Sequence, residues 1–144
     1  MTRYVLDTNQ IIAAGTGWLK YGAPVPDNVC SRRLLIHVAR NETGLHCPAI
    51  MQEYVEKLVT LNHPAERIGE MVKYLLGAFE QVHVVTQNAP HPPSDPDDEI
   101  FLLCAMDGNA DYLISDDAAL LDVSAHYPSF VICQPHVETV RLGI

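Results

Sequence analysis

The stretch Asp95–Leu121, DPDDEIFLLCAMDGNADYLISDDAALL, begins with four acids that directly precede an apolar segment. Further on, a second apolar run, Tyr112–Ile114, is followed by two more acids. Asp95 suits an N-cap and Pro96 the first position of a helix that is predicted to run to about Gly108. Within it, Ile100 to Met106 is apolar on every side, as expected of a helix buried against a sheet. One helix cap does not require four acids in five positions, so the negative charge at the start of this helix calls for a further explanation.

The segments on both sides of this stretch alternate between short apolar runs and amphipathic ones. The sequence predicts strands at 3–6, 43–47, 82–85, 112–114 and 130–132, and helices at 27–40, 48–61, 64–79, 96–108, 117–122 and 137–141, with Asp27 or Asn28 as a cap and loops at 15–26 and 87–96. Strands that alternate with helices imply a parallel sheet covered on both faces. We therefore expect an α/β protein with three layers (α/β/α), about five parallel strands and one domain over residues 1–144.

Length and composition fit a globular protein of ordinary size. A chain of 144 residues with 48% hydrophobic residues can bury one core. No apolar run approaches the roughly 18 residues of a membrane span, and Asp7 interrupts the region where a signal peptide would be apolar. The four cysteines are widely spaced without a CxxC pair, which argues against a zinc site or a disulfide framework. We expect a cytoplasmic protein with no membrane association.

The charges are distributed unevenly along the chain, whose net charge is -9. Between Lys73 and Arg141 there is no Lys or Arg, but there are eleven Asp and Glu residues. This acidic half is either a solvated surface or the source of carboxylates that converge on a cation. A polyanionic partner would have to approach from the other half, and its candidate contacts are Lys20, Arg32, Arg33 and Arg40.

Several acids follow predicted strands, where α/β proteins bind ligands. Asp7 ends the first strand, Asp98 begins the helix after the third, and Asp116 and Asp117 follow Ser115 at the end of the fourth. If such carboxylates lie about 4 Å apart, each pair repels by roughly 4 kcal/mol at an effective dielectric constant of 20. Protons or a divalent cation must then offset the repulsion, and ligands that are all oxygen favour Mg²⁺ or Mn²⁺.

The order of three segments is recognisable. VLDTN near the N-terminus, PAIMQEYVEKL on a predicted helix and the stretch from Asp95 to Leu121 together resemble the PIN-domain family, in particular its toxin-like, VapC-like ribonucleases. The resemblance spans about residues 3–135. It implies an α/β fold of the PIN type.

The resemblance also implies a site. Its acidic residues fall on Asp7, Glu53, Asp98 and Asp117, as catalytic residues and metal ligands, with Asn9 and Ser115 as polar supports. The family often has Gly where this chain has Asp116, so either Asp116 or Asp117 could be the ligand, and alignment to Leu120–Leu121 favours Asp117. A basic residue that often follows that acid is replaced by Ala118.

The implied activity is that of a Mg²⁺- or Mn²⁺-dependent endoribonuclease, in which the four carboxylates hold one or two ions and a metal-activated water hydrolyses the RNA phosphodiester bond. Asn9 would fix Asp7, and Ser115 would position a water or a phosphate oxygen. Arg32, Arg33 and Arg40 are the expected contacts to the RNA backbone. The family resemblance further implies a homodimer and an antitoxin protein as partners.

Two alternatives remain open on the residues alone. The first is a phosphatase of the haloacid-dehalogenase type, but that family has a second Asp where this chain has Asn9, and a Lys in the region 74–144, where this chain has none. The second is a PIN-like binding module with little catalysis, acting through a protein partner. Acids at all four implied positions argue against a degenerate site.

Overall fold

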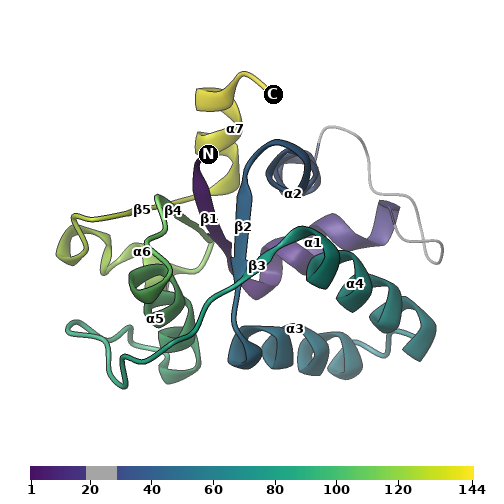
Figure 1. Cartoon of the computed structure of the whole chain (residues 1–144), viewed down its shortest axis with the longest axis horizontal. Coiled ribbons are helices and arrows are strands. Elements are labelled where there is room, and N and C mark those ends of the chain that lie inside the picture. Colours follow the sequence, from purple (N-terminus) through teal and green to yellow (C-terminus); the bar gives the residue numbers. More distant parts are fainter. Residues whose placement is uncertain (19–28) are drawn as a thin grey trace.

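The structure is a computed structural model that describes residues 1–18 and 29–144. In these residues the chain forms a five-stranded sheet in which all neighbouring strands are parallel, in the order β3-β2-β1-β4-β5 (Figure 1). The strands are β1 (Arg3–Leu6), β2 (Thr43–His46), β3 (Glu80–Gln81), β4 (Tyr112–Ile114) and β5 (Val131–Cys133). The chain extends the sheet from β1 first towards β3 and then towards β5. The point of reversal therefore lies at the carboxyl ends of β1 and β4, where α/β proteins bind ligands.

The helices connect these strands. They are α1 (Thr8–Trp18), α2 (Cys30–Asn41), α3 (Pro48–Thr60), α4 (Ala65–Ala78), α5 (Glu99–Asp107), α6 (Ala118–Leu121) and α7 (Pro135–Leu142), with single 3₁₀ turns η1 (Pro96–Asp98) and η2 (Ser124–His126). None of the helices in the described part of the chain has the length and apolar character needed to cross a membrane.

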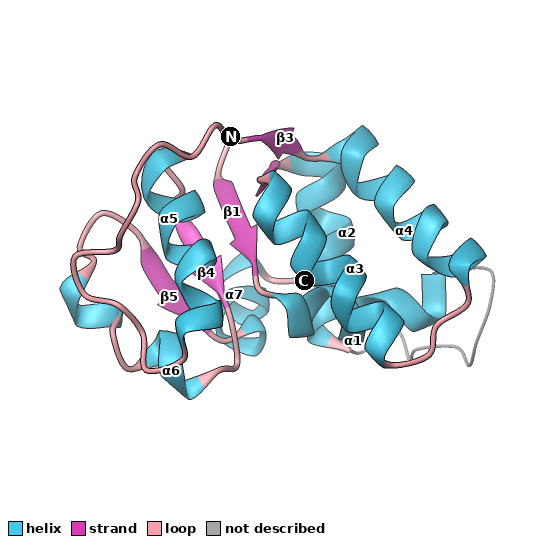
Figure 2. Cartoon of the chain, turned by 90° about the horizontal axis from the view of Figure 1, so that it is seen from below, coloured by secondary structure: helices cyan, strands magenta, loops and turns pink. Residues whose placement is uncertain are grey.

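Helices lie on both faces of the sheet, as the sequence predicts. The apolar helix α5 packs against β1, β2 and β4, whereas α2 packs against β2 and α7. On that second face the hydroxyl of Tyr4 in β1 donates a hydrogen bond of 2.6 Å to Glu138 in α7. Figure 2 shows α5 and α6 on one side of β1 and α3 and α4 on the other. The expected α/β fold with a parallel sheet is confirmed.

The start of the chain differs from the prediction. Residues 15–18 belong to α1 and not to a loop. This helix begins directly after β1, where Asp7 accepts a hydrogen bond from the Asn9 N–H and caps it. The rest of the predicted loop lies outside the described residues, as do Lys20, Asp27 and Asn28. The observed N-cap of α2 is Val29, without a side-chain hydrogen bond.

The third strand lies earlier than predicted, at Glu80–Gln81 and not at 82–85. Its partner β2 ends at His46, because Pro48 begins α3. Beyond that point the Val82 N–H still donates to the His46 carbonyl at 2.7 Å, but no ladder continues. Val85 is 69% exposed, and its N–H is bound by the Asp107 carboxylate. The length of a neighbouring strand, which the local sequence does not reveal, therefore sets where β3 ends.

Candidate metal centre

Six acids line one cavity of about 250 Å³, and the four that the family resemblance implies are among them. Asp7 follows β1 directly, Asp117 is the N-cap of α6 after β4, and Asp98 is the N-cap of α5. Because β1 and β4 are parallel neighbours, their carboxyl ends bring Asp7 and Asp117 to the same edge. Glu53 reaches the cavity from α3. The structure therefore brings together the four residues that the family resemblance implies.

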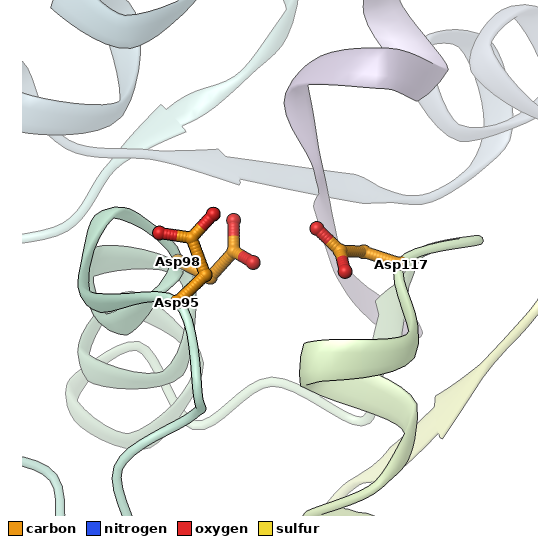
Figure 3. Close-up of side chains that lie close together, drawn as sticks. All are labelled: Asp95, Asp98 and Asp117. Atoms are coloured by element: carbon orange, nitrogen blue, oxygen red, sulfur yellow. The ribbon is translucent and has the colours of Figure 1, made fainter.

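Asp95 joins Asp98 and Asp117 in the tightest part of this cluster. One carboxylate oxygen from each of the three lies within 4.8 Å of the others. Figure 3 shows Asp95 and Asp98 facing Asp117 across a shared space. Oδ2 of Asp98 is buried and has no hydrogen-bond partner, and the same holds for Oγ1 of Thr8, which also lines the cavity. Acceptor oxygens without donors are the groups that a cation would satisfy.

Asp7 is the most tightly held of the acids. It is 4% exposed, its Oδ1 accepts the Asn9 N–H at 2.7 Å, and its Oδ2 accepts the hydroxyl of Ser115. Ser115 in turn accepts the Asp117 N–H at 2.9 Å. Asn9 therefore contacts Asp7 through its backbone N–H, whereas Asn9 itself is exposed. The Ser115 hydroxyl proton is directed to Asp7 and not to a water or phosphate.

The neighbouring acids Asp116 and Asp117 point to different places. Asp116 is exposed and accepts hydrogen bonds from Gln10 at 2.9 Å and from Gln134 at 3.3 Å. It does not line the cavity, whereas Asp117 does. Oδ1 of Asp117 also accepts the Ala119 N–H at 2.9 Å, which caps α6. Of the two candidates for the ligand, the geometry brings Asp117 to the other acids.

Glu53 owes its position to the packing of α3. The buried side of this helix carries Ile50, Tyr54 and Leu58, and the Tyr54 hydroxyl donates to the Leu6 carbonyl at 2.5 Å. This bond anchors α3 at the last residue of β1, one residue before Asp7. Glu53 is half-buried at the cavity edge, beside an exposed lysine one turn further on, Lys57.

Crowding and burial raise the pKa values of the acids. Burial raises the pKa of Asp7, against the lowering effect of the bonds from Ser115 and Asn9. Burial first, and then the carboxylate of Asp117, raises the pKa of Asp98 to about 8. The pKa of Glu53 is raised by its partial burial and by the charge of Asp97. These carboxyl groups of the cavity therefore bind protons more readily than isolated ones, and a positive charge in the cavity would favour their ionised form.

The cavity is also lined by Asp95, Asp97 and Lys57, which the sequence does not assign to the site. Asp95 was assigned as a helix cap, and its Oδ1 does accept the Asp97 N–H at 3.0 Å. The sequence signal that Asp95 also belongs to the cavity is the excess of acids over the number that one helix cap needs. Lys57 lies one helical turn after Glu53, a spacing that places both on one face of α3.

The predicted RNA contacts lie elsewhere. Arg32, Arg33 and Arg40 of α2 line a separate hollow of about 360 Å³ together with Ile144, and this hollow shares no residue with the acidic cavity. The first turn of α2 nevertheless lies close to the site, because the Ser31 hydroxyl donates to Gln10 of α1 at 2.5 Å.

Comparisons with known proteins point to one family. A family profile described as a PIN domain matches residues 3–119. A chain in the crystal structure of VapBC2 from Rickettsia felis, bound to a DNA fragment from their promoter, superposes with a TM-score of 0.57. It is 15% identical and the alignment covers 91% of this chain and 97% of that chain. At that identity the likeness is one of fold. No curated protein matches the chain.

Proposed function

Because the chain belongs to the PIN-domain family, whose members are generally nucleases, we propose that it is a Mg²⁺- or Mn²⁺-dependent endoribonuclease of the cytoplasm. The observation that carries the proposal is the convergence of Asp7, Glu53, Asp98 and Asp117 on one cavity. The donor set fits a hard divalent cation, because it consists of carboxylate oxygens, one of them buried without a partner.

Asp7, Glu53, Asp98 and Asp117 would hold the ion, with Asp95 close to the last two. A divalent cation held there would lower the pKa of a coordinated water and offset negative charge on the scissile phosphate. Ser115 and the Asn9 N–H fix both oxygens of Asp7, so this carboxylate needs little reorganisation. Asp98 releases its proton when the positive charge enters. The basic residue that often follows the last acid in the family is replaced here by Ala118. Lys57 instead offers a positively charged side chain at the cavity edge.

A partner protein is part of the proposal. We propose that the chain is the toxin of a toxin–antitoxin pair, acts as a homodimer and is inhibited by an antitoxin. The structural likeness to a VapBC complex supports this partner class. An acidic cavity would also accept an Arg or Lys side chain from such a protein, in the place of the cation.

The proposal is tested by incubating the purified protein with panels of RNA and DNA, in the presence of Mn²⁺, Mg²⁺ or EDTA. We expect RNA cleavage that requires the ion and that Asp7→Asn and Asp98→Asn each abolish. Asp122→Asn is the matched control, because Asp122 is an exposed acid just beyond α6 that does not line the cavity.

Three results would contradict the proposal. Cleavage that survives both substitutions would remove the site assignment. Hydrolysis of p-nitrophenyl phosphate without RNA cleavage would favour the phosphatase alternative. No cleavage at all, combined with tight binding of a co-expressed partner protein, would favour the binding module.

A further inference from the structure

A second set of hydrogen bonds runs alongside the acidic cavity, outside it. Gln10, in the first turn of α1, is 2% exposed and uses both ends of its side-chain amide. Its Oε1 accepts the hydroxyl of Ser31 in α2 at 2.5 Å, and its Nε2 donates to Oδ2 of Asp116 at 2.9 Å. Gln134, just before α7, donates to the other oxygen of Asp116 at 3.3 Å.

This network fixes the direction of three consecutive side chains. Side chains alternate in extended backbone, and Asp117 has φ -75° and ψ 124°. Ser115 and Asp117 therefore share one side, where Ser115 binds Asp7 and Asp117 lines the cavity. Asp116 takes the other side, where Gln10 and Gln134 hold it. If the backbone after Ser115 turned in the opposite direction, Asp116 would face the cavity and Asp117 would lie outside it.

The network also ties together the two segments that supply facing ligands. Gln10 lies three residues after Asp7, and Asp116 lies one residue before Asp117. The bond between Gln10 and Asp116 thus runs beside the bond between Ser115 and Asp7. Together with the backbone bond from the Asp7 N–H to the Ile114 carbonyl at 3.0 Å, these links set the separation of Asp7 and Asp117. The buried amide is oriented by Ser31, so it is not free to turn.

We infer that Gln10 is a positioning residue of the metal centre: by binding Asp116 outside the cavity, it directs Asp117 inward and excludes Asp116 from the ligand set. The inference rests on the proposed function, since it concerns the affinity of the same site for a divalent cation. Groups that orient metal ligands typically contribute about 10- to 100-fold to metal affinity.

The test is calorimetric titration of the full-length protein with Mn²⁺. In Gln10→Met the side chain keeps its length but loses both hydrogen bonds, and we expect the Kd for Mn²⁺ to rise by roughly tenfold or more. In Asp116→Asn an oxygen remains to accept the Gln10 amide, so we expect a Kd within about threefold of the unaltered protein. Asp117→Asn removes a ligand and should abolish the binding.

A second pair of variants keeps the side-chain volume constant in case Gln10→Met does not fold. Gln10→Glu retains the acceptor for Ser31 but loses the donor to Asp116, and should weaken Mn²⁺ binding. In the double variant Gln10→Glu with Asp116→Asn, the amide on residue 116 can donate in the reverse direction, so the affinity should recover. The rise in melting temperature on adding Mn²⁺ should follow the same order, and a network that only stabilises the fold would not produce it.

The outcomes separate cleanly. If the unaltered protein does not bind Mn²⁺, the proposed function fails and this inference with it. If it binds and Gln10→Met or Gln10→Glu binds equally well, the positioning role alone is wrong. If Asp116→Asn weakens binding as much as Asp117→Asn, Asp116 is itself a ligand. A double variant that does not recover the affinity of Gln10→Glu likewise contradicts the inference.

Discussion

Asp98 combines two properties that either a proton or a bound cation would offset. Its Oδ2 is buried without a donor, and its pKa is raised to about 8, first by burial and then by Asp117. At neutral pH and without a bound ion the carboxyl group is therefore largely protonated. A cation that binds must displace this proton, so the affinity of the site for metal depends on pH.

The first prediction concerns this proton. Below about pH 8 we expect the affinity for Mn²⁺ to rise about tenfold per pH unit, because one proton leaves for each ion bound. Calorimetric titrations in buffers of different ionisation enthalpy measure the number of protons released. An affinity that stays constant between about pH 6 and 7.5 would contradict the assignment of Asp98 as the residue that exchanges its proton for metal.

The second prediction concerns the stability of the metal-free protein. The folded pKa of Asp98, about 8, lies above its ordinary value of 3.8. The protonated carboxyl therefore stabilises the fold at low pH, and this stabilisation is lost as the pH rises towards 8. Asparagine cannot ionise, so Asp98→Asn should melt higher than the unaltered protein at about pH 8.5, by about 3 °C or more, equivalent to about 1 kcal/mol.

Thermal melts in EDTA at about pH 5 and pH 8.5 provide the measurement, and the difference should be small at the lower value. Asp122→Asn is again the control for loss of a surface charge. Equal melting temperatures for Asp98→Asn and the unaltered protein at the higher pH would show that Asp98 ionises at no cost in the fold.

At the residue scale the sequence predicts the acids but not their surroundings. Asp7, Asp98 and Asp117 follow from strand ends, and Glu53 only from the family resemblance, because a Glu on an amphipathic helix is usually solvated. The separate directions of Asp116 and Asp117 depend on Gln10 and Gln134, which are distant in sequence. A motif that holds two adjacent acids cannot reveal which of them a remote amide will bind.

At the scale of elements, α5 is the support of the site. Asp98 is its N-cap, and Gly108, directly after its last residue, is its C-cap. A Cβ at Gly108 would lie 2.7 Å from the Cys104 carbonyl oxygen and 2.8 Å from Cγ2 of Val82. The carbonyl belongs to the helix backbone and cannot move aside as the end of a side chain can.

The third prediction is that Gly108→Ala destabilises the protein by about 1–3 kcal/mol, the usual cost of overpacking. Gly69→Ala is the matched control, because Gly69 lies within α4 and a Cβ there meets nothing within 4 Å. Replacing an open helical glycine by alanine should stabilise the fold by up to about 1 kcal/mol. Urea unfolding of both variants provides the measurement, and a Gly108→Ala variant as stable as Gly69→Ala would contradict the packing at the end of α5.

Most elements follow from local patterns. Two elements, α1 and β3, do not, and each exception has a physical reason. Proline at the start of α3 predicts the bounds of this helix to within one residue, whereas α5 begins three residues later than predicted, because Pro96–Asp98 form a 3₁₀ turn before it. The helix α1 contains Gly15 and Gly17, which predict a loop, but it packs between α2 and α3. Tertiary packing thus overrides a weak local propensity. The position of β3 depends instead on where its partner strand ends.

At the scale of the whole molecule, the charge is arranged so that the acidic cavity repels a polyanion such as the proposed RNA substrate. The net charge is -9, and six acidic residues line the cavity that this substrate would have to reach. The arginines of α2 begin beside α1, through the bond between Ser31 and Gln10, and extend along about 12 Å of helix axis from Arg32 to Arg40. Among the described residues, the features beside the site that can attract a polyanion are therefore a bound cation, Lys57 and these arginines.

The fourth prediction follows from this arrangement. RNA that is protected from cleavage by a modified backbone should bind only when Mn²⁺ is present, because without the ion the carboxylates repel the phosphates. Replacing Arg32, Arg33 and Arg40 together by Gln should reduce the slope of log K against log salt concentration by about 2, at about 0.7 per phosphate contact on single strands. It should leave the affinity for Mn²⁺ unchanged, because the arginine hollow and the acidic cavity share no residue.

Fluorescence anisotropy with a labelled RNA over a range of salt concentrations provides the measurement, and Arg67→Gln is the control, since Arg67 belongs to α4 and lines neither cavity. A triple variant with an unchanged salt dependence would remove α2 from the RNA path, and the substrate would then have to approach over Lys57. Binding of RNA in EDTA as tight as in Mn²⁺ would instead mean that the phosphates do not enter the acidic cavity, because Lys57 alone does not offset the charge of the six acids that line it.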